Sequence, residues 1–457
     1  MPGTPFVEGC RQERETFLAL RGAPQAAALR HIFFAERRAQ STGSRFSEPP
    51  QTITAAVVVG GGNMGASIAY ALATLEIEVT IVETDAAGAQ RARDNVARLY
   101  GQAVKRGKMS AEAAQQAQDA LFRVQVGYAD LPQADIAIEA AFEDMGIKQQ
   151  IFAQLDAALP KNAILATNTS YLNVNQIAAE ISHPERVLGL HFFSPAHIMA
   201  LLEVVKAEKT SVEVLSTAYG LAKRMRKIPV AAGVCDGFIG NRILTRYRQT
   251  TDIVMLEGAL PWEIDAAMRA FGFAMGPYEV QDLSGLDIAY ANRQRLGWSD
   301  MSDFRYIPIA DRLVEELKRL GRKTSAGWYD YPESGKGLQS QAVEDIVIET
   351  ARAAGVARKE FTETEIAERA LAAMVEEGCR ILEEGIADRP ADIDLVMVHG
   401  YAFPRWRGGV MCHADTVGLP DILRRIEAYA AEDPLSWSPP DLLRRLVQSG
   451  QNFDSLN

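Results

Sequence analysis

The sequence predicts an α/β protein: a doubly wound domain with a mainly parallel sheet, followed by a duplicated all-α domain. Short apolar runs of strand length alternate with helical stretches from residue 53 to about residue 235, which is typical of βαβ units. After Asp236 helical periodicity takes over. At 457 residues the chain is too long for one compact core. We expect a helical connector and linker over 1–50, the doubly wound domain over 51–235, and two helical repeats over 236–345 and 346–457.

Local patterns define the N-terminal segment and the strands. Residues 6–40 carry apolar residues at helical spacing and predict one or two helices, broken near Pro24. Residues 41–52 are rich in Ser and Pro and predict a linker. The expected strands are the apolar runs at 55–59, 79–83, 123–126, 136–139, 164–167, 187–190 and 202–205.

The helical part contains two similar segments, residues 256–288 and 382–422. Both contain an acidic residue near a Gly, then Ile-Asp, two further residues and Met, then a Gly-aromatic-Ala turn with Pro, then Asp-x-x-Gly-Leu. This order predicts a duplicated helical domain whose copies pack on each other, although chance similarity of two amphipathic helices is an alternative. The second copy has no obvious catalytic residues, so we expect its role to be structural.

A glycine-rich turn follows the first expected strand. It reads G-x-G-x-x-G, opens a helical stretch, and is followed about 20 residues later by Glu83 at the end of the next strand. Gly60 permits a tight turn, Gly62 lets the backbone approach a pyrophosphate, and Gly65 allows close helix–strand packing. An acid at Glu83 would hold a ribose 2′-hydroxyl and repel a 2′-phosphate, so we expect an NAD-binding (Rossmann) domain; a glycine turn in an ordinary α/β core is the alternative. The cofactor residues predicted here are Gly60, Gly62, Asn63, Met64, Gly65 and Glu83.

One histidine and one carboxylate stand out in the later strands. His191 lies where an apolar run ends, and Glu203 lies inside Leu-Leu-Glu-Val-Val. A buried carboxylate is costly unless a partner pairs with it. A turn at Ser194-Pro195 would bring the second strand back and supply the imidazole as that partner. Such a histidine is suited to general-base work, while a core histidine without a catalytic role is the alternative.

Further polar residues follow the strands at the edge where such sheets bind ligands. Glu143 comes just after one strand, with Lys148 opening the next helix, and Asn168 and Ser170 come after the following strand. Together with His191 they are expected to converge near the reactive ring of the cofactor. Ser170 as a helix N-cap and Asn168 as a turn residue are the simpler alternatives.

Composition narrows the possible partners. The net charge of −11 argues against nucleic acid, and no apolar run reaches the roughly 18 residues needed to span a bilayer. The cysteines fit a reducing compartment and predict neither disulfides nor a metal site. The N-terminus lacks an apolar signal region, and the chain ends Ser-Leu-Asn, so the expected compartment is the cytoplasm. The four cysteines are Cys10, Cys235, Cys379 and Cys412.

The motifs together resemble the L-3-hydroxyacyl-CoA dehydrogenases, in particular the dehydrogenase part of peroxisomal-type multifunctional β-oxidation enzymes and their bacterial relatives. The resemblance covers nearly the whole chain. It rests on VVVGGGNMG, AIEAAFEDMGIKQQIF, ILATNTSYL, GLHFFSPAHIMALLEVV, DGFIGNRIL, FGFAMGPYEVQDLSGLD, GRKTSAGWYDY and FPRWRGG.

The resemblance implies NAD-dependent oxidation of L-3-hydroxyacyl-CoA to 3-ketoacyl-CoA in fatty-acid β-oxidation. His191 would be the general base on the 3-hydroxyl, with Glu203 orienting and charging it. Ser170 and Asn241 would hold the substrate oxygens. The implied contacts to the nicotinamide end of the cofactor are Glu143 and Lys148, with Asn168 beside them.

The same resemblance points to a coenzyme A site on the helix after the second strand. Lys105 or Arg106 aligns with a lysine that grips coenzyme A in the single-domain relatives, whereas Leu99 stands where those relatives carry a serine. Residues 91–108 hold six basic residues against one acid, an excess that suits a phosphate-rich ligand. A solvated basic helix face is the alternative.

Several alternatives stay open. The N-terminal helices resemble the connector that follows a hydratase domain in the multifunctional enzymes, so the sequence fits either a piece of a longer protein or a stand-alone form, with a hydratase or thiolase as an expected partner. The chain could instead oxidise a free 3-hydroxy acid, or be a non-catalytic structural relative. Because an internal second repeat could replace the dimer partner of single-copy relatives, we expect a monomer, with a dimer left open.

Overall fold

The computed structural model describes residue 3 and residues 5–301, 305–333 and 335–457. The chain forms two compact units. The first, here called the sheet unit, comprises Leu29–Arg242 and Glu384–Tyr401. The second, here called the helical unit, comprises Met1–Ala28, Ile243–Glu383 and Ala402–Asn457. The segment 384–401 therefore groups with the sheet unit, although it lies within the predicted second repeat.

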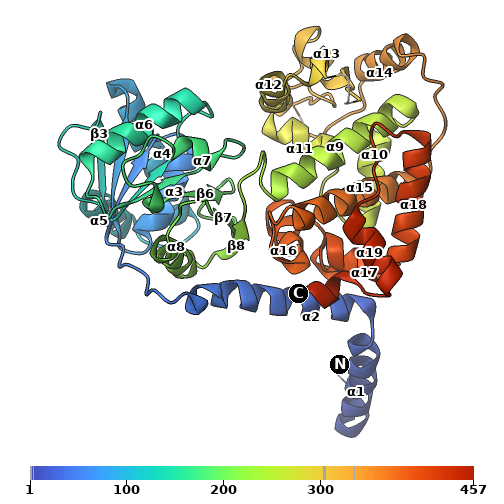
Figure 1. The fold of residues 1–457 in the computed structure, drawn as a ribbon, viewed down its shortest axis with the longest axis horizontal. Helices are drawn as coiled ribbons and strands as arrows, with labels where there is room; N and C mark the ends of the chain where they lie inside the picture. Colours follow the sequence, from blue (N-terminus) through green and yellow to red (C-terminus); the bar gives the residue numbers. More distant parts are fainter. Residues whose placement is uncertain (1–2, 4, 302–304, 334) are drawn as a thin grey trace. The chain divides into compact units, whose positions relative to one another are not determined.

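The sheet unit is built on one eight-stranded sheet in the order β3-β2-β1-β4-β5-β6-β7-β8, drawn in blue to green in Figure 1. All neighbouring strands are parallel except β6 and β7, which are antiparallel. The chain winds from β1 outward to β3 and then returns to β4 and beyond, which puts crossover helices on both faces. The predicted doubly wound α/β class is confirmed. The strands are β1 (Ala55–Val59), β2 (Glu78–Glu83), β3 (Phe122–Val126), β4 (Ile136–Glu139), β5 (Ile164–Thr167), β6 (Val187–Phe192), β7 (Leu201–Val205) and β8 (Ile228–Ala232).

Strand β8 was not among the predicted strands. Its sequence IPVAA contains Pro229, which lowers its resemblance to a strand. The strand lies at the edge of the sheet beside β7, a place where a proline without an N–H is tolerated.

The crossover helices begin where short polar side chains cap them. The carboxylate of Asp85 accepts a hydrogen bond from Gly88 N at the start of α4, and that of Asp144 accepts one from Ile147 N at the start of α6. The helices that lie wholly or mostly in the sheet unit are α2 (Pro24–Ser41), α3 (Asn63–Ala73), α4 (Ala86–Lys105), α5 (Ala111–Leu121), α6 (Met145–Ala158), α7 (Val174–Ile177), α8 (Val212–Arg224) and α16 (Pro390–Gly400).

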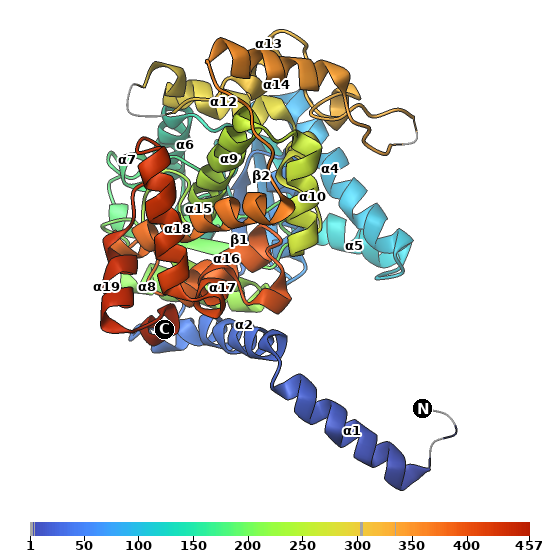
Figure 2. The same ribbon diagram turned by 90° about the vertical axis from the view of Figure 1, so that its right-hand side faces the viewer.

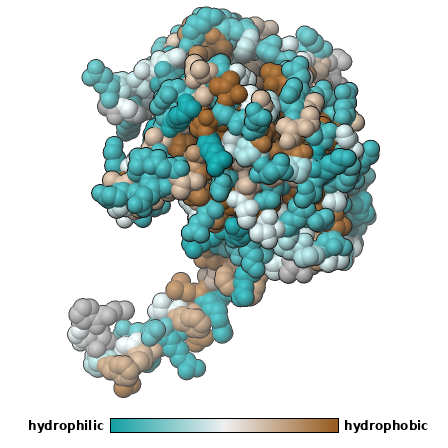
Figure 3. Space-filling view, turned by 90° about the vertical axis from the view of Figure 1, so that its left-hand side faces the viewer, coloured by the Kyte–Doolittle hydropathy of each residue, from teal (hydrophilic) through white to brown (hydrophobic). Residues whose placement is uncertain are grey.

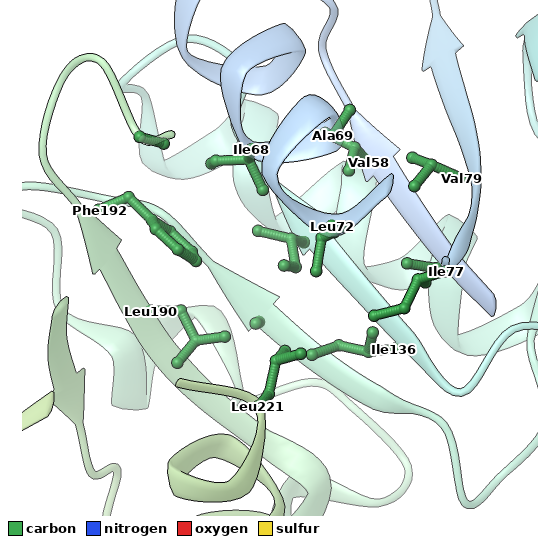
Figure 4. Packing of buried hydrophobic residues seen from close by; sticks show 14 of the residues in the cluster. Val58, Ile68, Ala69, Leu72, Ile77, Val79, Ile136, Leu190, Phe192 and Leu221 are labelled. Carbon is green, nitrogen blue, oxygen red and sulfur yellow. The ribbon is translucent and has the colours of Figure 1, made fainter. Parts of the chain in front are cut away.

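The main core of the sheet unit lies between the sheet and helices α3, α4 and α8. Ile68 and Leu72 of α3 are fully buried, and Figure 4 shows them packed over β1 and toward Leu190 and Phe192 of β6. Truncating a buried leucine of this kind to alanine costs about 2–5 kcal/mol of the free energy of unfolding. This packing fixes the helix that carries the glycine turn against the strands that carry the polar residues.

Two histidine–carboxylate pairs join α2 to α16 within the sheet unit. His31 Nε2 lies 2.8 Å from Asp394 Oδ2, and His399 Nε2 lies 2.7 Å from Glu36 Oε1. Helix α16 also packs on β7 and β8. These contacts explain why a segment of the second repeat belongs to this unit. The predicted helix break near Pro24 is confirmed, since α1 (Phe6–Arg21) ends before α2 begins at Pro24.

The helical unit confirms the predicted all-α character, and α10 and α15 lie side by side in it (Figure 2). None of the described helices is both long and apolar enough to cross a membrane. Helix α1 has no buried residue, and its brown and tan apolar atoms are visible in Figure 3. The remaining helices that lie mostly in this unit are α9 (Gly240–Glu257), α10 (Pro261–Phe271), α11 (Pro277–Ser284), α12 (Leu286–Leu296), α13 (Ile309–Glu315), α14 (Gln341–Ala353), α15 (Glu363–Glu383), α17 (Val410–Val417), α18 (Leu419–Glu432) and α19 (Asp441–Ser449).

The two repeats correspond helix by helix, α10–α11–α12 to α16–α17–α18. Both first helices begin with a proline, Pro261 and Pro390. Both second helices end at a glycine with nearly the same backbone angles: Gly285 has φ 103° and ψ 126°, and Gly418 has φ 103° and ψ 119°. Only glycine adopts such angles readily, so the matching angles explain why the glycine of Asp-x-x-Gly-Leu recurs in both segments.

Candidate active site

The glycine turn has the geometry of a dinucleotide cradle. Gly60 has φ +93°, and a Cβ on Gly65 would lie 1.8 Å from Gly60 O, so neither position accepts a side chain without a shift. A Cβ on Gly62 would meet no atom of the described part of the chain within 4 Å. Gly62 is the N-cap of α3 and has no side-chain oxygen to satisfy the first N–H groups, which makes this helix end suited to an anion. The residues present therefore fit the pyrophosphate of a dinucleotide, with Asn63 and Met64 forming the first turn of the helix.

Glu83 lies beside this turn, at the end of β2. Its Oε1 accepts a hydrogen bond from Gly61 N at 2.6 Å. A Cβ on Gly88 would lie 2.7 Å from Glu83 Oε2, so the start of α4 lies close against the same carboxylate. The acid is thus held at the edge of the cradle, and its contact with a ribose stays a prediction.

A buried ion pair supports the next strand ends. Glu139 and Lys148 are 0% and 1% exposed, and Lys148 Nζ donates to both carboxylate oxygens of Glu139 at 2.7 and 2.9 Å. Thr167 Oγ1 and Ala141 N also donate to Glu139, which satisfies the buried charge. Lys148 is therefore engaged inside the protein, and its predicted contact with the cofactor stays a prediction. Glu139 was missed at the sequence level, although an acid inside the apolar run IAIEAA carries the same signal as Glu203.

Glu143 holds the loop that carries Ser170. Its Oε1 accepts hydrogen bonds from Thr169 Oγ1 at 2.5 Å, Ser170 N at 2.8 Å and Tyr171 N at 3.0 Å. Its other oxygen lies 3.3 Å from Lys148 Nζ, and the side chain is 33% exposed. The structure thus gives Glu143 a positioning contact toward the candidate site that the sequence did not suggest.

Asn168 joins two neighbouring strand ends. Its Oδ1 accepts a hydrogen bond from Phe192 N at 2.8 Å, which ties the end of β5 to the end of β6. Asn168 therefore fixes the backbone next to His191, and its predicted contact with the cofactor stays a prediction.

His191 and Glu203 are brought together as the buried-acid argument predicted. They are direct partners in the antiparallel register of β6 and β7, and His191 Nδ1 lies 2.6 Å from Glu203 Oε2. Glu203 is 0% exposed, and its Oε1 accepts from Ile239 N at 3.2 Å and Gly240 N at 3.1 Å. These donors hold the carboxylate in place, so that its Oε2 accepts a hydrogen from Nδ1 of the imidazole and leaves Nε2 as the acceptor.

Ser170 and Asn241 complete the group. Ser170 Oγ lies 3.2 Å from His191 Nε2, and Asn241 Nδ2 donates to Ser170 O at 3.4 Å. Asn241 lies in the first turn of α9, directly after the backbone that binds Glu203. The four residues predicted to be catalytic therefore lie in one contact chain, with a hydroxyl, an amide and an imidazole nitrogen available to an alcohol or ketone oxygen.

A basic cavity of about 240 Å³ lies beside α3 and α4 in the sheet unit. Burial lowers the pKa of Lys227 to about 8, and burial followed by nearby cations lowers the pKa of His197. His197 Nδ1 is buried and has no hydrogen-bond partner among the described residues, so a polar ligand group could satisfy it. Arg106 lines this cavity, whereas Lys105, the other predicted coenzyme A residue, is not among its lining residues. The lining residues include Tyr70, Leu99, Arg106, Lys108, His197 and Lys227.

A doubly wound sheet with a dinucleotide cradle and a histidine–carboxylate pair at its strand ends defines the class of dinucleotide-dependent dehydrogenases. Two family models match this chain: "3-hydroxyacyl-CoA dehydrogenase, NAD binding domain" over residues 55–235, and "3-hydroxyacyl-CoA dehydrogenase, C-terminal domain" over residues 237–331 and 366–454. The chain therefore belongs to the 3-hydroxyacyl-CoA dehydrogenase family, which confirms the resemblance seen in the sequence. The description of the first model also agrees with the predicted cofactor, NAD.

Relatives and solved structures agree with this assignment. The chain is 38% identical to the peroxisomal bifunctional enzyme of Danio rerio and 35% identical to that of Homo sapiens, over 98% of this chain and 64% of each relative. It thus spans somewhat less than two thirds of their length. The structure is similar to 3-hydroxybutyryl-CoA dehydrogenase from Escherichia coli, with a TM-score of 0.73 and 27% identity over 88% of this chain and 100% of that one. It is also similar to the dehydrogenase part of multifunctional enzyme 1 from C. elegans, with a TM-score of 0.63 and 26% identity over 91% and 96%.

Proposed function

We propose that this chain catalyses the NAD-dependent oxidation of L-3-hydroxyacyl-CoA to 3-ketoacyl-CoA, and the reverse reduction, as the dehydrogenase step of fatty-acid β-oxidation. The observation that carries the proposal is the contact chain from Glu203 through His191 to Ser170, on the sheet that also carries the dinucleotide cradle. The family assignment supports the same reaction.

The side chains divide the work as follows. His191 Nε2 takes the proton of the substrate 3-hydroxyl, and Glu203 stabilises the imidazolium that results. Ser170 Oγ and Asn241 Nδ2 are the donors that hold the substrate oxygen. NAD, when bound in the cradle of Gly60, Gly62 and Gly65, supplies the hydride acceptor. In the reverse direction the protonated His191 returns its proton to the ketone oxygen.

The basic cavity supports a thioester of coenzyme A as the substrate. Arg106, Lys108 and Lys227 put positive charge around one cavity of a chain whose net charge is −11. Such a concentration of cations attracts the phosphates of coenzyme A. Arg106 is the predicted residue that this observation supports.

The proposal is tested by following NADH oxidation with three ketones: acetoacetyl-CoA, S-acetoacetyl-N-acetylcysteamine, which lacks the phosphates, and free acetoacetate. We expect kcat/KM to fall in that order and NADPH to be a poor donor. The variant Arg106→Ala should raise KM for acetoacetyl-CoA about 10-fold and leave KM for the phosphate-free thioester unchanged. Arg91→Ala, within α4 and outside the cavity lining, is the matched control, since Arg106 directly follows the same helix.

Each rival function has its own outcome in this assay. Equal or better turnover of free acetoacetate would favour a dehydrogenase of free 3-hydroxy acids. Absence of turnover with all three ketones would favour a non-catalytic relative. The intact contact chain of Ser170, His191 and Glu203 argues against the latter, because a buried carboxylate without a use is costly.

The proposed reaction also bears on the partners of this protein and on its cellular compartment. A hydratase activity, carried by a longer form of this chain or by a partner, fits relatives that are named bifunctional. For the dehydrogenase part a monomer remains our prediction. The cytoplasm was predicted from the sequence, whereas relatives are named peroxisomal and glyoxysomal. We propose that the compartment is the one in which the hydratase works, because the two activities share an intermediate.

A further inference from the structure

The second helical repeat was predicted to be structural, but its first helix ends in contact with the candidate active site. Tyr401 follows α16 within the sheet unit, and its hydroxyl donates a hydrogen bond to Asn241 Oδ1 at 2.9 Å. Asn241 is the residue whose amide nitrogen faces Ser170 O at 3.4 Å. The hydroxyl of Tyr401 therefore anchors the far side of an amide whose nitrogen, among the residues that the structure describes, is held toward Ser170 by one long hydrogen bond.

This anchor stabilises the orientation in which the amide nitrogen of Asn241 faces Ser170 O, a carbonyl oxygen that can only accept. An asparagine side chain can turn over and exchange its oxygen and nitrogen. With Oδ1 bound to Tyr401, Nδ2 stays on the Ser170 side and remains a donor to a substrate oxygen. In the reversed orientation Asn241 Oδ1 would face Ser170 O, and two carbonyl oxygens would repel each other and the substrate oxygen.

The ring of Tyr401 also lies beside Gly240 and Phe193, which are close to the histidine–carboxylate pair. A Cβ on Gly240 would lie only 2.3 Å from Tyr401 Cε2, and Gly240 N is one of the donors to Glu203. On the other side the ring packs edge-on against Phe193, with centroids 5.6 Å apart, and Phe193 lies 4.6 Å from the ring of His191. One side chain thus contacts both the loop that binds Glu203 and the aromatic residue beside His191.

We propose that Tyr401 is a positioning residue for the reaction, supplied by the second repeat, which orients the amide of Asn241 toward the substrate oxygen. The inference rests on the proposed function. Tyr401 acts through Asn241, so its removal should matter only while that amide is present.

The test uses Tyr401→Phe, which keeps the ring and its packing and removes only the hydroxyl. With acetoacetyl-CoA and NADH, we expect kcat/KM for the ketone to fall about 3- to 10-fold, the size expected for one neutral hydrogen bond. The Kd for NADH and the thermal midpoint should stay at the wild-type values. In an Asn241→Ala background the same substitution should have no further effect. Tyr100→Phe, a buried tyrosine in α4 outside the site, is the matched control and should behave as wild type.

The outcomes separate the inference from the proposed function. An active wild type with an unchanged Tyr401→Phe variant would overturn the inference alone. A loss of equal size with and without the Asn241 amide would also overturn it, because the hydroxyl would then act by another route. A wild-type protein inactive with every ketone would overturn both.

Discussion

His191 and Glu203 face each other across the antiparallel strands β6 and β7, with Nδ1 and Oε2 2.6 Å apart. The register alone sets this contact, because directly opposed residues of such strands lie on the same face. The sheet thus builds the pair from two strands in its interior, where both side chains are held by packing. The backbone donors of Ile239 and Gly240 then fix the other carboxylate oxygen.

The Glu203→Gln substitution should slow the chemical step and leave the fold intact. The amide oxygen can still accept from Ile239 N and Gly240 N, but an amide N–H facing His191 Nδ1 would favour the tautomer with its hydrogen on Nε2. That tautomer cannot accept the substrate proton at Nε2, so we expect kcat to fall about 10²- to 10⁴-fold. The measurement is kcat with acetoacetyl-CoA and NADH, and a kcat equal to that of the wild type would refute the pairing.

Two glycines of the cradle should respond differently to alanine. In Gly65→Ala the new methyl would lie 1.8 Å from Gly60 O, so α3 must move, and we expect a loss of about 1–3 kcal/mol of the free energy of unfolding together with NADH binding. In Gly62→Ala the methyl meets nothing within 4 Å, and φ of −62° suits any residue. Stability should therefore be unchanged while the Kd for NADH rises, as measured by fluorescence titration. Wild-type NADH affinity in Gly62→Ala would show that the pyrophosphate lies elsewhere.

The stability of the helical unit should fall in mild acid because of His413. Burial, and then the charge of Arg407, lowers the pKa of His413 to about 4 from an ordinary 6.5. Between these pH values the unfolded chain binds a proton at His413 that the folded chain does not bind. The free energy of unfolding is therefore highest above pH 6.5 and decreases as the pH falls toward 4. This protonation lowers the free energy of unfolding by at most about 3 kcal/mol. Urea unfolding from pH 4 to 7 should be less pH-dependent in His413→Gln than in the wild type. Equal pH dependence of wild type and His413→Gln would contradict this account.

Local chemistry explains what could be predicted from the sequence. The glycine turn, the strand–helix alternation and the buried acid in Leu-Leu-Glu-Val-Val each depend on neighbours within a few residues or on one turn. They led to the sheet, the cradle and the pairing of His191 with Glu203. The same logic applied to IAIEAA would have found Glu139, whose buried charge demands a partner such as Lys148.

Long-range packing explains what was missed. The placement of α16 in the sheet unit depends on its contacts with α2, β7 and β8, and nothing in its own periodicity distinguishes it from the other helices of the repeats. The roles of Glu143 and Tyr401 toward Ser170 and Asn241 arise from segments that are distant in sequence. Such contacts leave no pattern in a single sequence.

The turnover of His191→Gln tests the central claim most directly, because every step assigned to the site passes through His191 Nε2. With acetoacetyl-CoA and NADH, we predict a fall in kcat of about 10²- to 10⁴-fold, while the Kd for NADH measured on the same preparation stays within about twofold, since the fold places the cradle on other elements. A variant that binds NADH normally and still reduces acetoacetyl-CoA at the wild-type rate would contradict the account.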